Sequence, residues 1–166
     1  MKQRGVLITG AGSGIGRTTA MRFASNRDLV VVNDIDEQKA AGVVKEIEAS
    51  GVEAMAAPAD ITHLDDVERM TKAVTERWGR IDVLINNAGV GDSRLFLETV
   101  PEDWHREIQV NIYGVLNVCK AVLPHMVRQN SGVVVNIASD AARVGEPYMA
   151  VYSMAKAGVV GFSKAL

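Results

Sequence analysis

A tyrosine and a lysine stand one helical turn apart in the segment "VYSMAKAGVVGF", at Tyr152 and Lys156. A free phenol, with a pKa of about 10, is a poor base at neutral pH. An ammonium group at i+4 on the same helical face comes within reach of the phenol and favours its ionised form. The pair therefore predicts proton transfer, with Tyr152 as the base in one direction and the acid in the other. The alternative is an aromatic residue on a helix face followed by a solvated lysine.

A glycine-rich segment, "VLITGAGSGIGR", joins the first apolar run to the first helical segment. Glycines at such a turn let a pyrophosphate approach the backbone and the N-terminus of the helix. The strict G-x-G-x-x-G spacing is absent, because Ile15 and Thr19 stand where its last glycine would fall, so a tight strand-to-helix turn is the alternative. The dinucleotide contacts that we expect from this segment are Gly10, Ser13, Gly14, Ile15 and Gly16.

An aspartate, Asp34, ends the second apolar run in "LVVVND". A carboxylate there can accept hydrogen bonds from the ribose hydroxyls of adenosine and repel a 2′-phosphate. No basic residue stands at positions 11–15 to compensate the charge of such a phosphate. We therefore expect NAD rather than NADP. Asp36 or Glu37 could share the role, and a solvated loop acid is the ordinary alternative.

A second acid, Asp60 in "PADIT", follows the alanine-rich third run. We expect Asp60 and Ile61 to contact the cofactor, with Asp60 reaching the amino group of adenine. The alternative is an acid that merely precedes a helix. Thr62, with Asp65 three residues later, predicts a capped start for that helix, and Gly79 predicts its end.

Short apolar runs rich in β-branched residues alternate with segments of helical period. Such runs predict strands that are buried on both faces of a parallel sheet. The predicted strands are 6–8, 29–32, 53–57, 83–85 and 133–137, and the clearest predicted helices are 37–50, 62–78 and one that begins at Pro101 and bends near Pro124. The alternation predicts an α/β fold with a doubly wound, Rossmann-like parallel sheet, in which ligands bind beyond the carboxyl ends of the strands.

The composition fits one domain. The 166 residues are 48% hydrophobic, and the formal net charge is −2, with lysine and arginine scattered along the chain. This pattern offers no binding surface for nucleic acid or an anionic membrane, so the expected partner is a small molecule. Cys119 is the single cysteine, and no Cys/His cluster has metal-ligand spacing, so we expect neither a disulfide nor a metal, and a reducing cytoplasm fits best. No stretch is expected to approach the apolar length of a membrane span.

Four motifs, "TGAGSGIG", "INNAG", "NIASD" and "YSMAK", follow one another in order. In this order the chain resembles the short-chain dehydrogenase/reductase family from about residue 5 to its last residue. The resemblance implies that the cofactor is also lined by Asn87, Ala88, Gly89, Tyr152 and Lys156. It further implies a catalytic tetrad of Asn111, Ser139, Tyr152 and Lys156.

Each tetrad residue has a role that its chemistry can perform. Ser139, after the fifth predicted strand, can donate a hydrogen bond to the substrate oxygen as charge develops there. By resemblance, Asn111 would locally open its helix and hold a water that connects Lys156 to solvent. The ordinary alternatives are a helix cap at Ser139 and a polar residue inside a helix at Asn111.

The expected function is that of an NAD-dependent oxidoreductase acting on a secondary alcohol or its ketone. The alternatives are a 3-oxoacyl-type ketone reductase and a non-catalytic dinucleotide-binding module or inactive fragment. Family members continue with further strands and a lid over the substrate, so the resemblance implies that residues 1–166 are a single but C-terminally incomplete domain, truncated after the fifth strand and the start of the next helix. We expect an exposed sheet edge at 133–137, little activity from this chain alone, and a homo-oligomer for a full-length protein.

Overall fold

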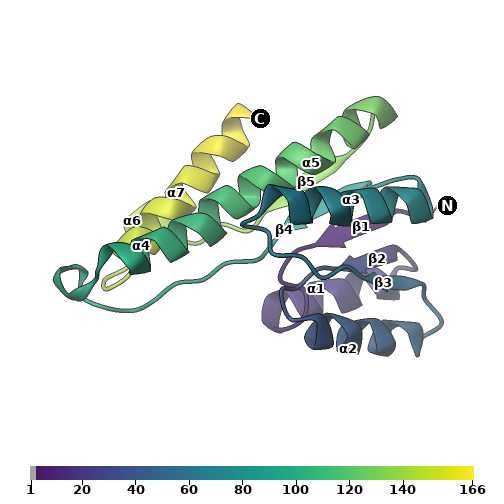
Figure 1. Ribbon diagram of the computed structural model, residues 1–166, viewed down its shortest axis with the longest axis horizontal. Helices are drawn as coiled ribbons and strands as arrows, with labels where there is room; N and C mark the ends of the chain where they lie inside the picture. Colours follow the sequence, from purple (N-terminus) through teal and green to yellow (C-terminus); the bar gives the residue numbers. More distant parts are fainter. Residues whose placement is uncertain (1–2) are drawn as a thin grey trace.

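The computed structural model describes residues 3–166. Within this range, parallel strands form a five-stranded sheet in the order β3-β2-β1-β4-β5 (Figure 1). The strands are β1 (Gly5–Ile8), β2 (Leu29–Val32), β3 (Ala54–Ala56), β4 (Val83–Asn86) and β5 (Val133–Asn136). β1 therefore lies at the centre, with β2 on one side and β4 on the other, and the winding of the chain reverses there.

Alternate residues of the central strands face opposite sides of the sheet, and each side is covered by helices. Val6, Ile8 and Val30 pack on one face with apolar residues of α1 (Gly14–Ser25) and α2 (Glu37–Glu48). Leu7 and Leu84 pack on the other face with residues of α3 (Leu64–Trp78) and α5 (Gly114–Gln129). Because both faces are covered, the central strands are continuous apolar runs. β5 differs from the expectation of a strand buried on both faces, because it lies at the edge of the sheet and exposes Val133 and Val135. The predicted doubly wound α/β sheet is confirmed.

The second half of the chain is dominated by one long helical rod (Figure 1). It consists of α4 (Pro101–Ile108), the π-helical turn η2 (Gln109–Tyr113) and α5, which contains Pro124. The irregularity of the rod thus falls at η2. The short elements η1 (Phe96–Glu98) and α6 (Ala141–Val144) precede α4 and α7 (Ala150–Ala165), respectively, and α7 packs against α4 and η2.

The rod also corrects the expectation about membrane-spanning length. Because η2 joins α4 and α5 without a break, Pro101–Gln129 forms a helix of 29 residues, which is long and apolar enough to cross a membrane by length and composition. The expectation that no stretch approaches this length is therefore wrong. Its residues Val118, Cys119 and Val122 are buried with those of α3, however, and the core helices of soluble proteins have the same character.

The start of α3 differs from the predicted cap. His63 is the N-cap residue and makes no side-chain capping bond. The hydroxyl of Thr62 instead donates to Asp60 Oδ1 at 2.7 Å, so a local turn takes the group that was expected to cap the helix. The predicted end is confirmed, since Gly79 adopts a left-handed φ of 70°.

Candidate active site

A cleft of about 610 Å³ opens beyond the carboxyl ends of β1, β2 and β4. This is the point where the winding reverses, which is where open α/β sheets bind ligands. It brings together every predicted cofactor residue except Tyr152 and Lys156. Those residues are Gly10, Ser13, Gly14, Ile15, Gly16, Asp34, Asp60, Ile61, Asn87, Ala88 and Gly89.

Most of the glycines that line the cleft stand where no side chain fits, whereas a Cβ on Gly14 would meet nothing within 4 Å. Gly10 has a φ of +62°, and a Cβ on it would lie 2.9 Å from the Cα of Ala88. A Cβ on Gly16 would lie 2.5 Å from Asn87 Nδ2 and would also collide with the carbonyl oxygen of Gly10. The backbone is therefore bare where a pyrophosphate would approach it.

Hydrogen bonds join the loop after β1 to the loop after β4. The hydroxyl of Thr9 accepts from the backbone amides of Asn87 and Ala88 at 3.0 and 3.1 Å, and Asn87 Nδ2 donates to the carbonyl oxygens of Thr9 and Gly10 at 2.9 and 3.1 Å. Ser13, the N-cap residue of α1, makes no side-chain capping bond. The first amides of α1 thus remain for an anionic ligand at a rigid loop pair.

Asp34 lies at the rim of the cleft, where its carboxylate is held by backbone amides. Oδ2 accepts from Gly12 at 2.9 Å, and Oδ1 accepts from Asp36 at 3.0 Å. Asp36 instead caps α2, where hydrogen bonding, above all from the amide of Lys39, lowers the pKa of its carboxyl. Of the two acids, Asp34 is therefore the one that lines the cleft.

Asp60 and Ile61 form the opposite side of the cleft. Burial raises the pKa of Asp60, but hydrogen bonds from the amide and hydroxyl of Thr62, and the nearby His63, outweigh burial and leave this pKa below its usual value. Ile61 is buried, and its carbonyl oxygen accepts from Asn117 Nδ2 on α5 at 2.9 Å. The segment after β3 is thereby fixed to the long helical rod.

The π-helical turn surrounds Asn111, whose side chain is fully buried. Its Nδ2 donates to the carbonyl oxygens of Val90 at 2.6 Å and Glu107 at 2.9 Å, and its Oδ1 accepts from the amide of Val90 at 3.3 Å. A Cβ on Gly89 would lie 2.8 Å from Asn111 Oδ1 and 3.3 Å from Lys156 Nζ. Asn111 and Lys156 therefore meet at the same point of the loop after β4.

Tyr152 and Lys156 lie in the first two turns of α7 and face this loop. Lys156 is only 4% exposed, and its Nζ donates to the carbonyl oxygen of Ile137 at 2.9 Å. The same Nζ lies 5.7 Å from the centroid of the Tyr152 ring, and burial lowers the pKa of the lysine. A lysine side chain is thus held beside the phenol ring, near the point where Gly89 lines the cleft.

Ser139 lies just beyond β5, in the segment that leads into α6. Its Oγ accepts from the amide of Ala141 at 3.2 Å, which is a local turn one residue before Asp140, the N-cap of α6, and not a helix cap. Accepting this bond leaves the hydroxyl proton available for donation to a ligand. Since α6 packs against α7, Ser139 and Tyr152 belong to neighbouring segments.

The sequence profile of the short chain dehydrogenase family matches residues 4–166. The chain belongs to this family. Among its curated relatives are proteins named 3-oxoacyl-[acyl-carrier-protein] reductase. The one from Synechocystis sp. is 45% identical over 95% of this chain and 64% of its own length, and the one from Staphylococcus epidermidis is 40% identical over 97% and 66%. The chain therefore spans about two thirds of the length of these relatives.

Solved structures of short chain dehydrogenases have the same fold as this chain. A short chain dehydrogenase/reductase from Burkholderia phymatum in complex with NAD superposes with a TM-score of 0.96 at 33% identity, covering 99% of this chain and 59% of that one. An NAD+-bound xylitol dehydrogenase gives 0.95 at 32% identity, covering 98% and 63%.

The cleft of this short chain dehydrogenase has further lining residues that the sequence analysis missed. They are Asn33, Ile35, Ala59, Val90 and Val110. Asn33 connects two strand ends, because its Nδ2 donates to the carbonyl oxygens of Ala57 and Ala59 at 3.0 and 3.2 Å. Their only signal in the sequence is that each stands beside or close to a predicted site residue.

Proposed function

We propose that this chain carries the cofactor site and the proton-transfer residues of an NAD-dependent oxidoreductase that acts on a secondary alcohol or its ketone. One observation carries the proposal. The buried cation of Lys156, at i+4 from Tyr152, lies beside Gly89, and Gly89 lines the dinucleotide cleft. The proposed proton-transfer residues thus adjoin the proposed cofactor cleft.

The cleft fits a dinucleotide. Its floor is backbone at Gly10 and Gly16, where side chains would collide. The N-terminus of α1 opens into the cleft and suits a pyrophosphate. The cleft volume of about 610 Å³ lies in the range of small-molecule and cofactor sites. A bound nicotinamide would supply hydride transfer from the alcohol carbon in oxidation and to the carbonyl carbon in reduction. Asp34 favours NAD, because its carboxylate would repel a 2′-phosphate.

The side chains handle the proton. In oxidation the alcohol loses its hydroxyl proton to the oxygen of Tyr152 as the hydride leaves its carbon, which yields the carbonyl. Lys156 supplies the positive charge that favours the phenolate, and the Ser139 hydroxyl donates to the substrate oxygen. Asn111, which lies beside Lys156, would hold the route by which the proton reaches solvent.

A second candidate, reduction of a 3-oxoacyl thioester, is favoured by the names of the curated relatives. It uses the same residues in the opposite direction, with Tyr152 as the acid. A cytoplasmic location and a homo-oligomeric full-length protein also remain predictions.

The test is a panel of secondary alcohols, ketones and a 3-oxoacyl thioester on a full-length version of the protein, because little activity is expected from residues 1–166 alone. Each reaction is followed by the absorbance of the reduced nicotinamide with NAD or NADP. We expect turnover of at least one pair, with a lower dissociation constant for NAD. Turnover of the thioester alone would favour the second candidate. Cofactor binding without turnover of any substrate would instead indicate a non-catalytic module.

A further inference from the structure

A buried carboxylate on α4 is not used by the proposed reaction. Glu107 is 5% exposed, although α4 is a helix at the molecular surface. Its Oε1 accepts from the backbone amide of Asp92 at 2.9 Å, and its Oε2 is buried without a hydrogen-bond partner among the described residues. A buried carboxylate is costly, so its single bond to the loop after β4 calls for a reason.

Glu107 and Asn111 stand one turn apart and hold the same loop. Asn111 binds both the amide and the carbonyl of Val90, and Glu107 binds the amide of Asp92. The two side chains are linked, since Asn111 Nδ2 also donates to the carbonyl oxygen of Glu107. The segment 90–92 is thereby fixed at both of its ends to α4 and η2.

The residue between these two attachments, Gly91, faces the other way. A Cβ on Gly91 would lie 2.8 Å from Cδ2 of Tyr152 and 2.9 Å from Cε of Met149. The loop is therefore packed between α4 on one side and the phenol ring on the other. Any displacement of segment 90–92 toward α7 would move this ring.

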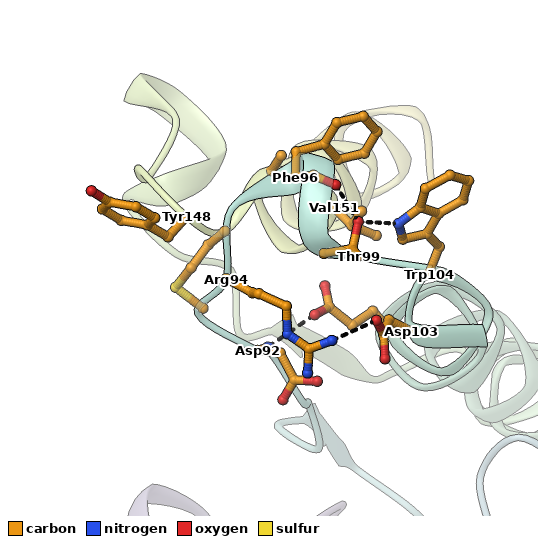
Figure 2. Close-up of a pocket in the computed structure, with 11 residues that line it drawn as sticks. Asp92, Arg94, Phe96, Thr99, Asp103, Trp104, Tyr148 and Val151 are labelled. Carbon is orange, nitrogen blue, oxygen red and sulfur yellow. Dashed lines mark hydrogen bonds and ion pairs between the residues drawn. The ribbon is translucent and has the colours of Figure 1, made fainter. Parts of the chain in front are cut away.

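Glu107 also lines a small cavity, and Figure 2 shows the paired side chains around it. The cavity is too small for a substrate. Its volume is about 20 Å³, which is room for about one water. Arg94 pairs with Asp103 at 2.9 Å, and Trp104 Nε1 donates to Thr99 Oγ1 at 2.7 Å, so its wall is a network of paired groups. The position of Glu107 is thus explained by the loop that it holds rather than by a ligand pocket.

We propose that Glu107 is a positioning residue: through the amide of Asp92 it fixes segment 90–92, and Gly91 on that segment sets the position of the Tyr152 ring. The inference rests on the proposed function in so far as Tyr152 is the proton-transfer group. Its physical content, the control of the ring position by Glu107, can be measured without turnover.

Two conservative substitutions of Glu107 separate the effect of its side-chain length from the effect of its charge. Glu107→Gln keeps an acceptor oxygen at the same distance but loses the charge. Glu107→Asp keeps the charge but is one methylene shorter, so it cannot reach the amide of Asp92. Gly91→Ala acts from the other side of the same segment, and Glu102→Gln, at an exposed position of α4, is the matched control.

The readout is the fluorine NMR signal of Tyr152 in chain labelled with 3-fluorotyrosine. The chain has three tyrosines, and Tyr152→Phe assigns the signal. We expect Glu107→Asp and Gly91→Ala to shift or broaden the Tyr152 signal, and Glu107→Gln and Glu102→Gln to leave it as in the unsubstituted chain. In turnover, kcat should fall about tenfold or more in the first two variants, with the KM for NAD changed less than twofold, because misplacement of a reacting group by 1 Å can cost about 10²-fold.

The opposite pattern would overturn the proposal. If Glu107→Gln disturbs the Tyr152 signal and Glu107→Asp does not, the charge matters and the reach does not. If Glu107→Asp does not fold, Gly91→Ala decides, and an unchanged Tyr152 signal and kcat there would show that the segment does not position the ring. A full-length version that turns over no substrate refutes the proposed function, whereas the fluorine signal still tests the role of Glu107.

Discussion

The side of this molecule that carries the proposed cofactor cleft and the side that carries the proposed proton-transfer residues are built differently; they are called the cofactor side and the proton-transfer side below. On the cofactor side, every residue of β1 and β4 is buried. The cleft floor consists of glycine and backbone atoms that are joined by hydrogen bonds. On the proton-transfer side, β5 exposes Val133 and Val135 by 56% and 40%. The buried residues of α7 are Ala155, Lys156 and Val159, so a charged group forms part of its small packed face.

The difference indicates two ways of holding a site. Backbone atoms in a packed sheet tolerate the loss of one side chain, provided that no atom is added to the glycines. A site made from side chains on one helix depends on each of them. Substitutions on the two sides should therefore affect stability, cofactor binding and turnover to different extents.

The largest effect should come from Tyr152→Phe, which removes the hydroxyl and little else. We expect turnover to fall by about 10²-fold or more, equivalent to about 2.7 kcal/mol of barrier, because the proton-transfer group is lost. The dissociation constant for NAD should change less than about threefold. Tyr113→Phe, at an exposed tyrosine, is the control. Near-normal turnover in Tyr152→Phe would mean that another residue is the base.

The next effect should come from Gly16→Val on the cofactor side. The added atoms would collide with Gly10 and Asn87, so we expect a loss of about 2 to 3 kcal/mol of stability and at least tenfold weaker NAD binding. Gly42→Ala on α2 is the control, since a Cβ there meets nothing within 4 Å. It should stabilise the helix by about 1 kcal/mol. Thermal unfolding measures the change in stability, and NAD titration measures the change in binding. If Gly16→Val changed neither, Gly16 would not be closely packed against Gly10 and Asn87.

Asp34→Asn should have a smaller and more selective effect. The amide oxygen can still accept from Gly12, whereas the charge that opposes a 2′-phosphate is gone. We expect the ratio of the dissociation constants for NAD and NADP to move about tenfold toward NADP, or about 1.4 kcal/mol. Cofactor titrations of the two proteins measure this ratio. A wild-type chain that already prefers NADP would contradict the assignment.

The smallest effect is expected for the stability of Lys156→Met. Burial lowers the pKa of Lys156 in the folded chain, so below that folded-state pKa the buried ammonium destabilises the fold. The destabilisation is relieved as the pH rises from the folded-state pKa toward the unfolded value of roughly 10.4. We expect Lys156→Met to raise Tm at pH 7 by about 3 °C, or about 1 kcal/mol, and the gain to shrink at alkaline pH.

The control for this experiment is Lys164→Met, at an exposed position of the same helix. It should show no such pH-dependent gain in Tm. If Lys156→Met lowered Tm at every pH, the hydrogen bond to the carbonyl oxygen of Ile137 would outweigh the cost of burial.

Much of the fold could be predicted because strands that are buried on both faces are continuous apolar runs. Such runs can be recognised in the sequence without knowing which strands they pair with. The strands of the sheet and the end of α3 at Gly79 follow from such local signals. The start of α3 could not be predicted from its spacing, because Asp60 competes for the hydroxyl of Thr62. The π-helical turn has no signal in the hydrophobic pattern, and only the family resemblance implied that the helix opens at Asn111. One of the side-chain partners of Asn111, Val90, is distant in the sequence.

The candidate site divides in the same way. It could be predicted that the glycine loop and Asp34 line one cleft, because their place follows from backbone conformation and from their position after a strand. Glu107 could not be predicted, because its partner is a backbone amide 15 residues away. From the sequence it is an ordinary acid on an exposed helix. Only the folded chain shows that it contacts the loop behind Tyr152.

The central position of β1 also sets the order in which the chain can assemble. Arg4 and Asp28, beside the β1–β2 pairing, are 24 residues apart, whereas Gly5 and Asp82, beside β1–β4, are 77 apart. Closing the longer loop costs about 1 kcal/mol more. During synthesis at roughly 5 to 20 residues per second, β1 must wait about 4 to 15 s for β4 to be made. The two loops that border the proposed cofactor cleft can therefore meet only late, so a dinucleotide that binds between them could not guide the early steps of folding.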